Sequence, residues 1–151
     1  MSKMSELSQK KRKTMELKDI KSVYFVGAGG IGMSAIARYF IHRGLVVAGY
    51  DKTPSALTAQ LEKEGMLIHY EENVDEIPHA CKNQDSTLVV YTPAIPQDHK
   101  ELVFFRENNF DVEKRAQVLG MLTRTHKGLC VAGTHGKTTT STMCAHIMHQ
   151  S

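Results

Sequence analysis

The segment that most constrains the fold of this chain is VGAGGIG, residues 26–32, which places Gly27, Gly29 and Gly32 in a G-x-G-x-x-G spacing. An apolar, β-branched run at 22–27 precedes the glycines, and a stretch with helical spacing of apolar residues follows them and stops at Gly44. In such a strand–loop–helix unit the first glycine makes the turn, the second lets the backbone approach a diphosphate and the third lets the helix pack closely on the strand. Unpaired amides at the helix N-terminus then face the anion. The pattern predicts a nucleotide-diphosphate site.

An acidic residue follows the loop at the distance that such a site needs. Asp51 comes directly after a second predicted strand, 45–50, and lies about 20 residues beyond the glycines, where a carboxylate can accept hydrogen bonds from ribose hydroxyls. Taken alone, these features indicate an NAD or FAD site. The alternative is a glycine-rich turn that serves only packing, and the motif does not identify the nucleotide.

The rest of the chain alternates short apolar strands with helices. We expect a helix from a cap at Ser55 to about Glu64, strands at 66–70 and 86–92, a helix near 98–108, a strand at 110–114 and a helix at 116–126. This order predicts an α/β fold with a Rossmann-like parallel sheet and helices on both faces. A new strand begins at 128 and leads into a second glycine loop and a helix, so we expect a second α/β domain to start there, after a boundary near Lys127.

The basic character of the chain is concentrated at its N-terminus. The net charge is +3, but five basic side chains and one acidic side chain give residues 1–14 a charge of +4 and leave −1 for the remainder. The sequence KKRK at 10–13 could bind nucleic acid or act in targeting. We expect instead a disordered leader over 1–19 and no nucleic-acid partner.

The composition also indicates the cellular compartment. The three cysteines, Cys81, Cys130 and Cys144, show neither a CxxC pair nor a metal-ligand spacing, as is usual in a reducing cytosol. No apolar stretch is long enough for a bilayer span, and the N-terminus has no signal-peptide pattern. We therefore expect a cytoplasmic protein with no membrane partner.

The second glycine loop is GTHGKTTT at 133–140, again between a predicted strand and a predicted helix. Backbone amides of this loop could wrap phosphate oxygens, Lys137 could reach the β- and γ-phosphates, and the Thr138 hydroxyl could be a ligand of Mg²⁺. The common P-loop spacing would need a glycine at Val131, so this loop is a shorter variant. We predict an ATP site here.

Three histidines near this loop have open roles. His135 lies within the loop and either contacts a ligand or only fills the turn. His146 and His149 lie three residues apart, a spacing that could suit a metal, although a solvated helix face is the more common use of such a pair.

Two phosphate-binding loops on one chain exclude a simple dehydrogenase, because hydride transfer needs no Lys-Thr cradle for a triphosphate. An NAD-binding oxidoreductase domain explains only the first loop. A regulatory nucleotide-binding module explains both loops and performs no catalysis. An enzyme that takes one nucleotide as part of its substrate and another as its energy source explains both loops and their order.

From about Ile20 to its end the chain resembles the Mur ligases. The resemblance rests on four stretches: GAGGIGMSAIA, VVYTPAIP, KRAQVLGMLTR and VAGTHGKTTT. The last matches the ATP loop of the family residue for residue, including the short spacing. Two stretches depart from the usual pattern, with Ala28 in place of isoleucine and Tyr91-Thr92-Pro93 in place of V-S-S.

The resemblance implies a three-domain ligase of peptidoglycan precursor synthesis that uses UDP-N-acetylmuramate, L-alanine and ATP with Mg²⁺. It implies a UDP-substrate domain at 20–127 and the start of the ATP-binding domain at 128–151, and we expect residues 1–151 alone to be inactive. A tripeptide-recycling ligase of the same family is the nearest alternative.

The resemblance also assigns site residues. ATP would be bound by Gly133, Thr134, His135, Gly136, Lys137, Thr138 and Thr139, with Lys137 and Thr138 as catalytic residues and Thr138 as the Mg²⁺ ligand. The UDP substrate would be bound by Gly27, Ala28, Gly29, Gly30, Ile31, Gly32, Asp51, Thr92, Ala94, Ile95 and Arg115.

Overall fold

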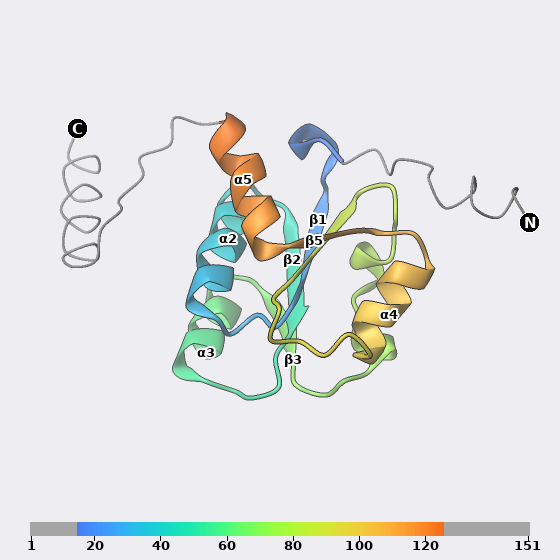
Figure 1. Ribbon diagram of the computed structural model, residues 1–151. Helices are drawn as coiled ribbons and strands as arrows, with labels where there is room; N and C mark the ends of the chain where they lie inside the picture. The colour runs from blue at the N-terminus through green and yellow to red at the C-terminus, as the bar shows by residue number, and fades with distance from the viewer. Residues whose placement is uncertain (1–14, 126–151) are drawn as a thin grey trace, which may run out of the picture. The chain divides into compact units, whose positions relative to one another are not determined.

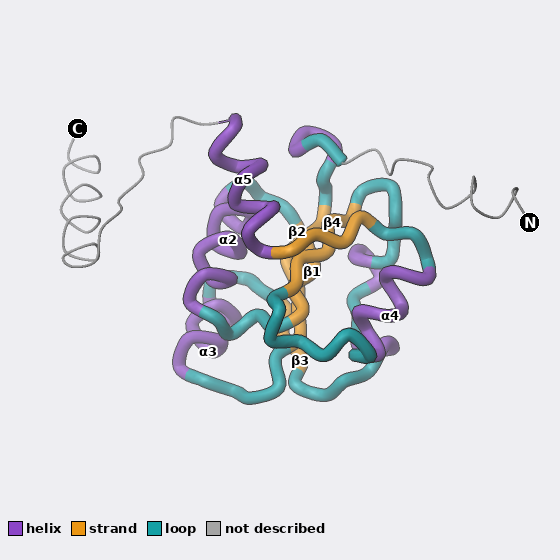
Figure 2. The backbone as a smooth tube through the Cα atoms, in the orientation of Figure 1, coloured by secondary structure: helices purple, strands orange, loops and turns teal. Residues whose placement is uncertain are grey.

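The computed structural model describes residues 15–125, which form one parallel β-sheet covered by helices on both faces (Figures 1 and 2). The strands are β1 (Ser22–Val26), β2 (Val46–Tyr50), β3 (Leu67–His69), β4 (Thr87–Tyr91) and β5 (Asp111–Lys114), in the spatial order β3-β2-β1-β4-β5. All four pairings are parallel. The predicted Rossmann-like parallel fold is confirmed.

The helices divide between the two faces. Helices α2 (Ile31–His42) and α3 (Ala56–Lys63) cover one face together with α5 (Arg115–Thr125), while α4 (Lys100–Glu107) covers the other (Figure 1). The 3₁₀ turns η2 (Val74–Glu76) and η3 (His79–Cys81) lie on the α4 side, and η1 (Leu17–Asp19) precedes β1. No helix among residues 15–125 is long and apolar enough to cross a membrane.

Local sequence explains where several elements begin and end. The Ser55 side chain accepts a hydrogen bond from the Thr58 amide, and the Thr58 hydroxyl accepts one from the Ser55 amide, so a capping box starts α3. Gly44 and Gly65 have φ values of +79° and +110°, which suit glycine where a helix ends and the chain turns into the next strand. The sequence predicted both helix ends.

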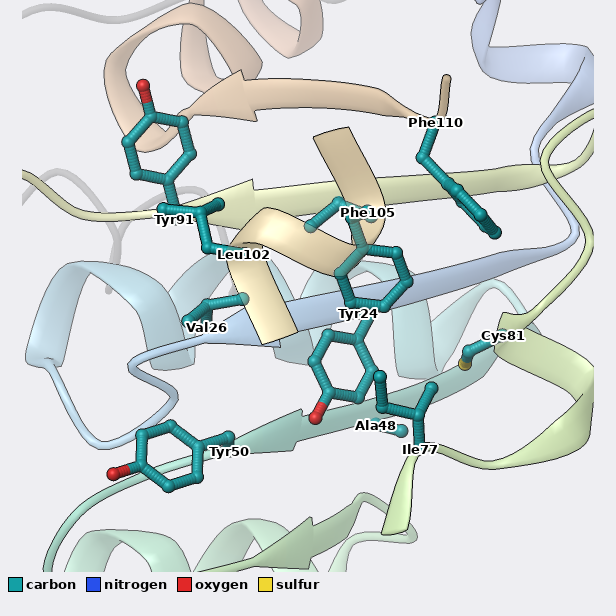
Figure 3. Packing of buried hydrophobic residues seen from close by; sticks show 11 residues of the cluster. Tyr24, Val26, Ala48, Tyr50, Ile77, Cys81, Tyr91, Leu102, Phe105 and Phe110 are labelled. Carbon is teal, nitrogen blue, oxygen red and sulfur yellow. The ribbon is translucent and has the colours of Figure 1, made fainter. Parts of the chain in front are cut away.

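The core between the sheet and α4 is rich in aromatic side chains (Figure 3). Tyr24 packs against Phe105 with ring centroids 5.0 Å apart, and Phe105 meets Phe110 edge-on at 4.9 Å. Strand β1 is buried along its whole length, as expected for a central strand of a parallel sheet. This rigid centre fixes the carboxyl ends of β1, β2 and β4, where the loops of the candidate site begin.

Candidate functional site at the carboxyl edge of the sheet

The strand order changes direction at β1, which has β2 on one side and β4 on the other. In parallel α/β sheets, ligands bind outside the carboxyl ends of the strands at such a switch point. The glycine loop leaves β1 there, Asp51 follows β2, and Thr92 follows β4. The topology therefore brings three separately predicted segments to one edge.

Contacts at the three motif glycines show how closely these segments approach. A β-carbon on Gly27 would lie 3.3 Å from Ile95 Cδ1 and 3.5 Å from Thr92 Oγ1, and the φ of +96° is itself suited to glycine. A β-carbon on Gly29 would lie 2.7 Å from Asp51 Oδ2. The loop after β4 and the acidic residue after β2 thus both lie in close contact with the glycine loop.

The third motif glycine lies under Arg115, the first residue of α5. A β-carbon on Gly32 would overlap the guanidinium group, with Cζ only 3.1 Å away. The structure therefore places this predicted cation at the N-terminus of α2, next to the predicted diphosphate site. Arg115 is itself exposed, so its guanidinium is open to a ligand.

The amides of the glycine loop have different partners. Those of Gly27 and Ala28 both donate to the Tyr50 carbonyl oxygen at 2.8 Å, and the Ala28 side chain is buried. The Gly29 amide donates to Asp51 Oδ2 at 2.6 Å. The amide of Ala28 is thus hydrogen-bonded within the protein and its side chain is buried, so neither faces a ligand.

The remaining donors are those of α2. Gly30 is its N-cap and supplies no side-chain cap, and the first amides of a helix have no intrahelical acceptor. Ile31 is 85% exposed beside them. Among residues 15–125 no side chain caps this end of α2, so it presents backbone donors and a partial positive charge, with Arg115 nearby.

Asp51 is held in a defined orientation. While Oδ2 accepts from the Gly29 amide, Oδ1 accepts from the Thr53 amide at 3.0 Å. Ala94 is exposed on the loop after β4, whereas Thr92 and Ile95 are half-buried against Gly27. All the predicted UDP-site residues thus lie at this edge, although Ala28 faces inward.

The predicted ATP-site residues, Gly133 to Thr139, lie outside the described residues, as do His146, His149 and residues 1–14 of the predicted leader. The end of that leader is described and is not disordered: Leu17–Asp19 form η1, and the Met15 amide donates to Asp111 Oδ2 at 3.0 Å. Among residues 15–125, no group of three or more His, Cys, Asp or Glu side chains could hold a metal ion. Cys81 is buried, and burial raises the pKa of its thiol to about 11.

A buried polar network on the α4 side was not predicted. Glu101 has no exposed surface; its Oε2 accepts from the Tyr24 hydroxyl at 2.6 Å, and its Oε1 lies 2.6 Å from His69 Nε2. The Asn73 amide also donates to Oε1, at 3.2 Å. Burial and the neighbouring Glu101 raise the pKa of the Tyr24 phenol far above its usual range, so the phenol remains a donor.

His99 is the second residue that sequence reasoning missed. It caps α4 without a side-chain hydrogen bond, it is buried, and neither ring nitrogen has a partner among the described residues. Its ring centroid lies 4.7 Å from that of Tyr50. Acidic and basic side chains on a short helix usually face the solvent. The sequence therefore contained no signal that distinguishes Glu101 or His99 from surface residues.

A hollow of about 630 Å³ lies elsewhere, at the amino edge of the sheet, and is lined in part by Lys21, Ser86 and Asp111. None of the predicted site residues borders it. Its lining contains no glycine loop and no N-terminus of an α-helix, so the carboxyl edge remains the candidate site.

The described residues form an α/β domain of the doubly wound type, with its candidate site at the carboxyl ends of the strands. Residues 22–127 match the model of the Mur ligase family, catalytic domain. This match covers well over half of the chain, and the chain belongs to the Mur ligase family.

Curated relatives support this assignment. The chain is 63% identical over 137 residues to UDP-N-acetylmuramate–L-alanine ligase of Phocaeicola vulgatus and 61% identical over 137 residues to that of Parabacteroides distasonis. Each alignment covers 91% of this chain and 30% of the relative. The chain thus spans about a third of the length of these relatives.

Solved structures give the same family. UDP-N-acetylmuramate–alanine ligase MurC of Thermotoga maritima matches with a TM-score of 0.73 and 35% identity, over 85% of this chain and 29% of that one. A murein peptide ligase of Psychrobacter arcticus matches with a TM-score of 0.72 and 25% identity, over 85% and 26%. The described fold is therefore that of one part of these longer ligases.

Proposed function

We propose that the protein acts in peptidoglycan precursor synthesis as an ATP-dependent ligase that joins L-alanine to UDP-N-acetylmuramate. The observation that carries the proposal is the convergence of the glycine loop, Asp51 and Arg115 at the switch point, in a chain 63% identical to a ligase of that name. The cytoplasm is the compartment that we propose for the reaction.

In this proposal the described domain binds the UDP end of the substrate. The free amides at the start of α2 would donate to the pyrophosphate, and the Arg115 guanidinium would neutralise its charge. Asp51 would accept a hydrogen bond from the ribose. Thr92, Ala94 and Ile95 would line the same pocket from the loop after β4. Support comes from the placement of all these residues at one edge of the sheet.

ATP would bind at Gly133–Thr139, outside the described residues. Lys137 would contact the phosphates and Thr138 would be a ligand of Mg²⁺, which supplies neutralisation of phosphate charge when bound. The support for this part is the sequence of the loop and its fit to the family.

The reaction would proceed through an activated carboxylate. A lactyl carboxylate oxygen attacks the γ-phosphorus of ATP, ADP leaves, and an acyl phosphate forms. The alanine amine then attacks the acyl carbon, and the tetrahedral intermediate expels inorganic phosphate as the amide bond forms. The residues described here would position the substrate by its UDP end, and such positioning lowers the entropic cost of the reaction.

Ligand-dependent thermal stability of the 151-residue chain tests the binding part of this proposal. UDP-N-acetylmuramate and UDP should raise the melting temperature and NAD should not, since a ligand at 100 times its Kd adds about 2.7 kcal/mol to the free energy of unfolding. Stabilisation by NAD and by no uridine nucleotide would overturn it. In the full-length protein, ADP formation that depends on alanine and not on a tripeptide would separate the proposed reaction from tripeptide recycling.

A further inference from the structure

The amide that a diphosphate should use in a G-x-G-x-x-G loop already has an anionic partner in this structure. The Gly29 amide donates to Asp51 Oδ2 at 2.6 Å, a short hydrogen bond to a carboxylate, and hydrogen bonds to ionised acceptors are stronger than those between neutral groups. Gly29 is the middle glycine of the motif, the position where backbone approaches pyrophosphate. One N–H group cannot serve a carboxylate and a phosphate oxygen equally well.

The carboxylate is anchored at its other oxygen. Oδ1 accepts from the Thr53 amide at 3.0 Å, two residues further along the chain, so this hydrogen bond keeps the carboxylate next to the loop. Rotation about the side-chain bonds could move Oδ2 from Gly29 without moving the backbone. Asp51 therefore has two available acceptor roles, one toward the protein and one toward a ligand.

These roles have opposite consequences for different ligands. A free phosphate or pyrophosphate that approaches Gly29 meets the negative charge of Asp51 at close range and offers no donor in return. A nucleoside diphosphate brings ribose hydroxyls, which can donate to the displaced Oδ2 and replace the hydrogen bond lost from Gly29. The same residue thus opposes one ligand and favours the other.

Building on the proposed nucleotide site, we infer that Asp51 is a selectivity residue. Its carboxylate accepts the hydrogen bond of the Gly29 amide and releases this amide only when a diphosphate that carries a ribose binds. Nucleoside diphosphates therefore bind in preference to inorganic pyrophosphate. Arg115 at Gly32 and the free amides of α2 would otherwise attract any anion of sufficient charge. Cytoplasmic phosphates are abundant anions of this kind, and Asp51 discriminates against them.

The test compares inorganic pyrophosphate and UDP on the wild-type chain and on Asp51→Asn, in a buffer with EDTA at fixed ionic strength. Binding is followed by the amide NMR resonances of residues 29–32, which report on this loop and not on the second glycine loop. Asp85→Asn is the control, because Asp85 is exposed near the amino edge of the sheet and its loss changes the net charge by the same amount.

For Asp51→Asn we expect pyrophosphate to bind about tenfold more tightly and UDP about tenfold more weakly, whereas Asp85→Asn should change each Kd by less than about twofold. Equal weakening of both ligands, or weaker UDP binding without any gain for pyrophosphate, would overturn the inference. If Asp51→Asn does not fold, Asp51→Ser gives the same test, since a serine hydroxyl can still accept from the Thr53 amide.

The outcomes separate this inference from the proposed function. A wild-type chain that binds no uridine nucleotide, together with a pyrophosphate gain in Asp51→Asn, would remove the proposed function and retain only the exclusion of pyrophosphate by Asp51. UDP binding by the wild-type chain with no pyrophosphate gain in the variant would do the reverse.

Discussion

Arg115 covers the backbone of Gly32, so that its guanidinium occupies the space where any other residue at position 32 would place its β-carbon. The two residues come from elements far apart in sequence, the start of α2 and the start of α5. Gly32 therefore has a role beyond close helix–strand packing: it leaves room for a cation at the helix N-terminus.

Gly32→Ala should displace Arg115 and weaken UDP binding by about tenfold, since a guanidinium–phosphate contact contributes roughly 1.5–3 kcal/mol and only part of it would be lost. The displaced atoms are the far end of a flexible side chain, so the fold should tolerate the change. Binding can be measured by calorimetry.

Arg115→Ala and the double variant complete a cycle for this pair. If Gly32→Ala acts through Arg115, the double variant should bind UDP no more weakly than Arg115→Ala alone. Additive losses would show that Gly32 contributes independently of Arg115.

A different glycine should control stability. Gly49 lies in β2, where a β-carbon would fall 2.6 Å from the Phe25 carbonyl oxygen of β1 and 3.0 Å from Met66 Cε. Because the nearest obstacle is backbone of the paired strand, Gly49→Ala should lower the free energy of unfolding by about 2–3 kcal/mol in urea denaturation.

Gly120→Ala is the matched control for Gly49→Ala. Gly120 lies within α5, and a β-carbon there would meet nothing within 4 Å. The change should leave stability unaltered or raise it by up to about 1 kcal/mol, through helix propensity. A similar loss of stability in both variants would contradict the steric explanation.

Most of the fold could be predicted from the sequence because its strands are short apolar runs separated by glycine turns and capped helices. The predicted strand at 66–70 is observed at Leu67–His69, and the helix capped by Ser55 ends at Lys63. The segment 71–85 had no predicted element. It contains η2 and η3, whose single turns are too short to produce a periodic pattern.

The residues that the sequence assigned to the candidate site lie together at one edge of the sheet, but their contacts with one another could not be predicted. The motif located Gly29 and Asp51, but their mutual hydrogen bond depends on side-chain orientation, which spacing does not specify. Glu101 illustrates the other limit. On a short amphipathic helix a glutamate normally faces solvent, and its burial results from partners supplied by β1 and β3.

Glu113 should make stability depend on pH. Burial raises the pKa of its carboxyl group, and the neighbouring Asp111 raises it further. The folded state therefore favours the protonated form, and the contribution of Glu113 to stability is lost as pH rises through the folded-state pKa. Glu113→Gln should raise the melting temperature at pH 7 and leave it unchanged at pH 3, where the wild-type carboxyl is protonated.

The exposed Glu71 provides the control for Glu113, because Glu71→Gln removes the same charge from a loop. Its melting temperature should follow that of the wild type at both pH values. An equal gain at pH 7 in the two variants would attribute the effect to net charge and not to the environment of Glu113.

The buried carboxylate of Glu101 joins α4 to the sheet through Tyr24 of β1 and His69 of β3. Glu101→Ala should lower the free energy of unfolding by about 2–4 kcal/mol, because it removes the carboxylate acceptor of the buried Tyr24 hydroxyl, of the half-buried His69 ring and of the Asn73 amide, and leaves the Tyr24 hydroxyl only the His69 Nε2 atom, 3.2 Å away. Tyr24→Phe removes a single donor and should cost about 1.5–3 kcal/mol. Urea denaturation of each variant measures these losses.

A double variant distinguishes a coupled network from independent packing effects. Once Glu101 is alanine, the Tyr24 hydroxyl has lost its carboxylate, so adding Tyr24→Phe should cost much less than it does in the wild type. Full additivity of the two losses would show that the 2.6 Å contact between Tyr24 and Glu101 contributes little to stability. Helix α4 follows the loop that carries Thr92 and Ile95, so loss of the hydrogen bonds of Glu101 should also weaken UDP binding in variants that remain folded. Calorimetry at 10 °C, where the folded state of these variants is most populated, would measure that effect.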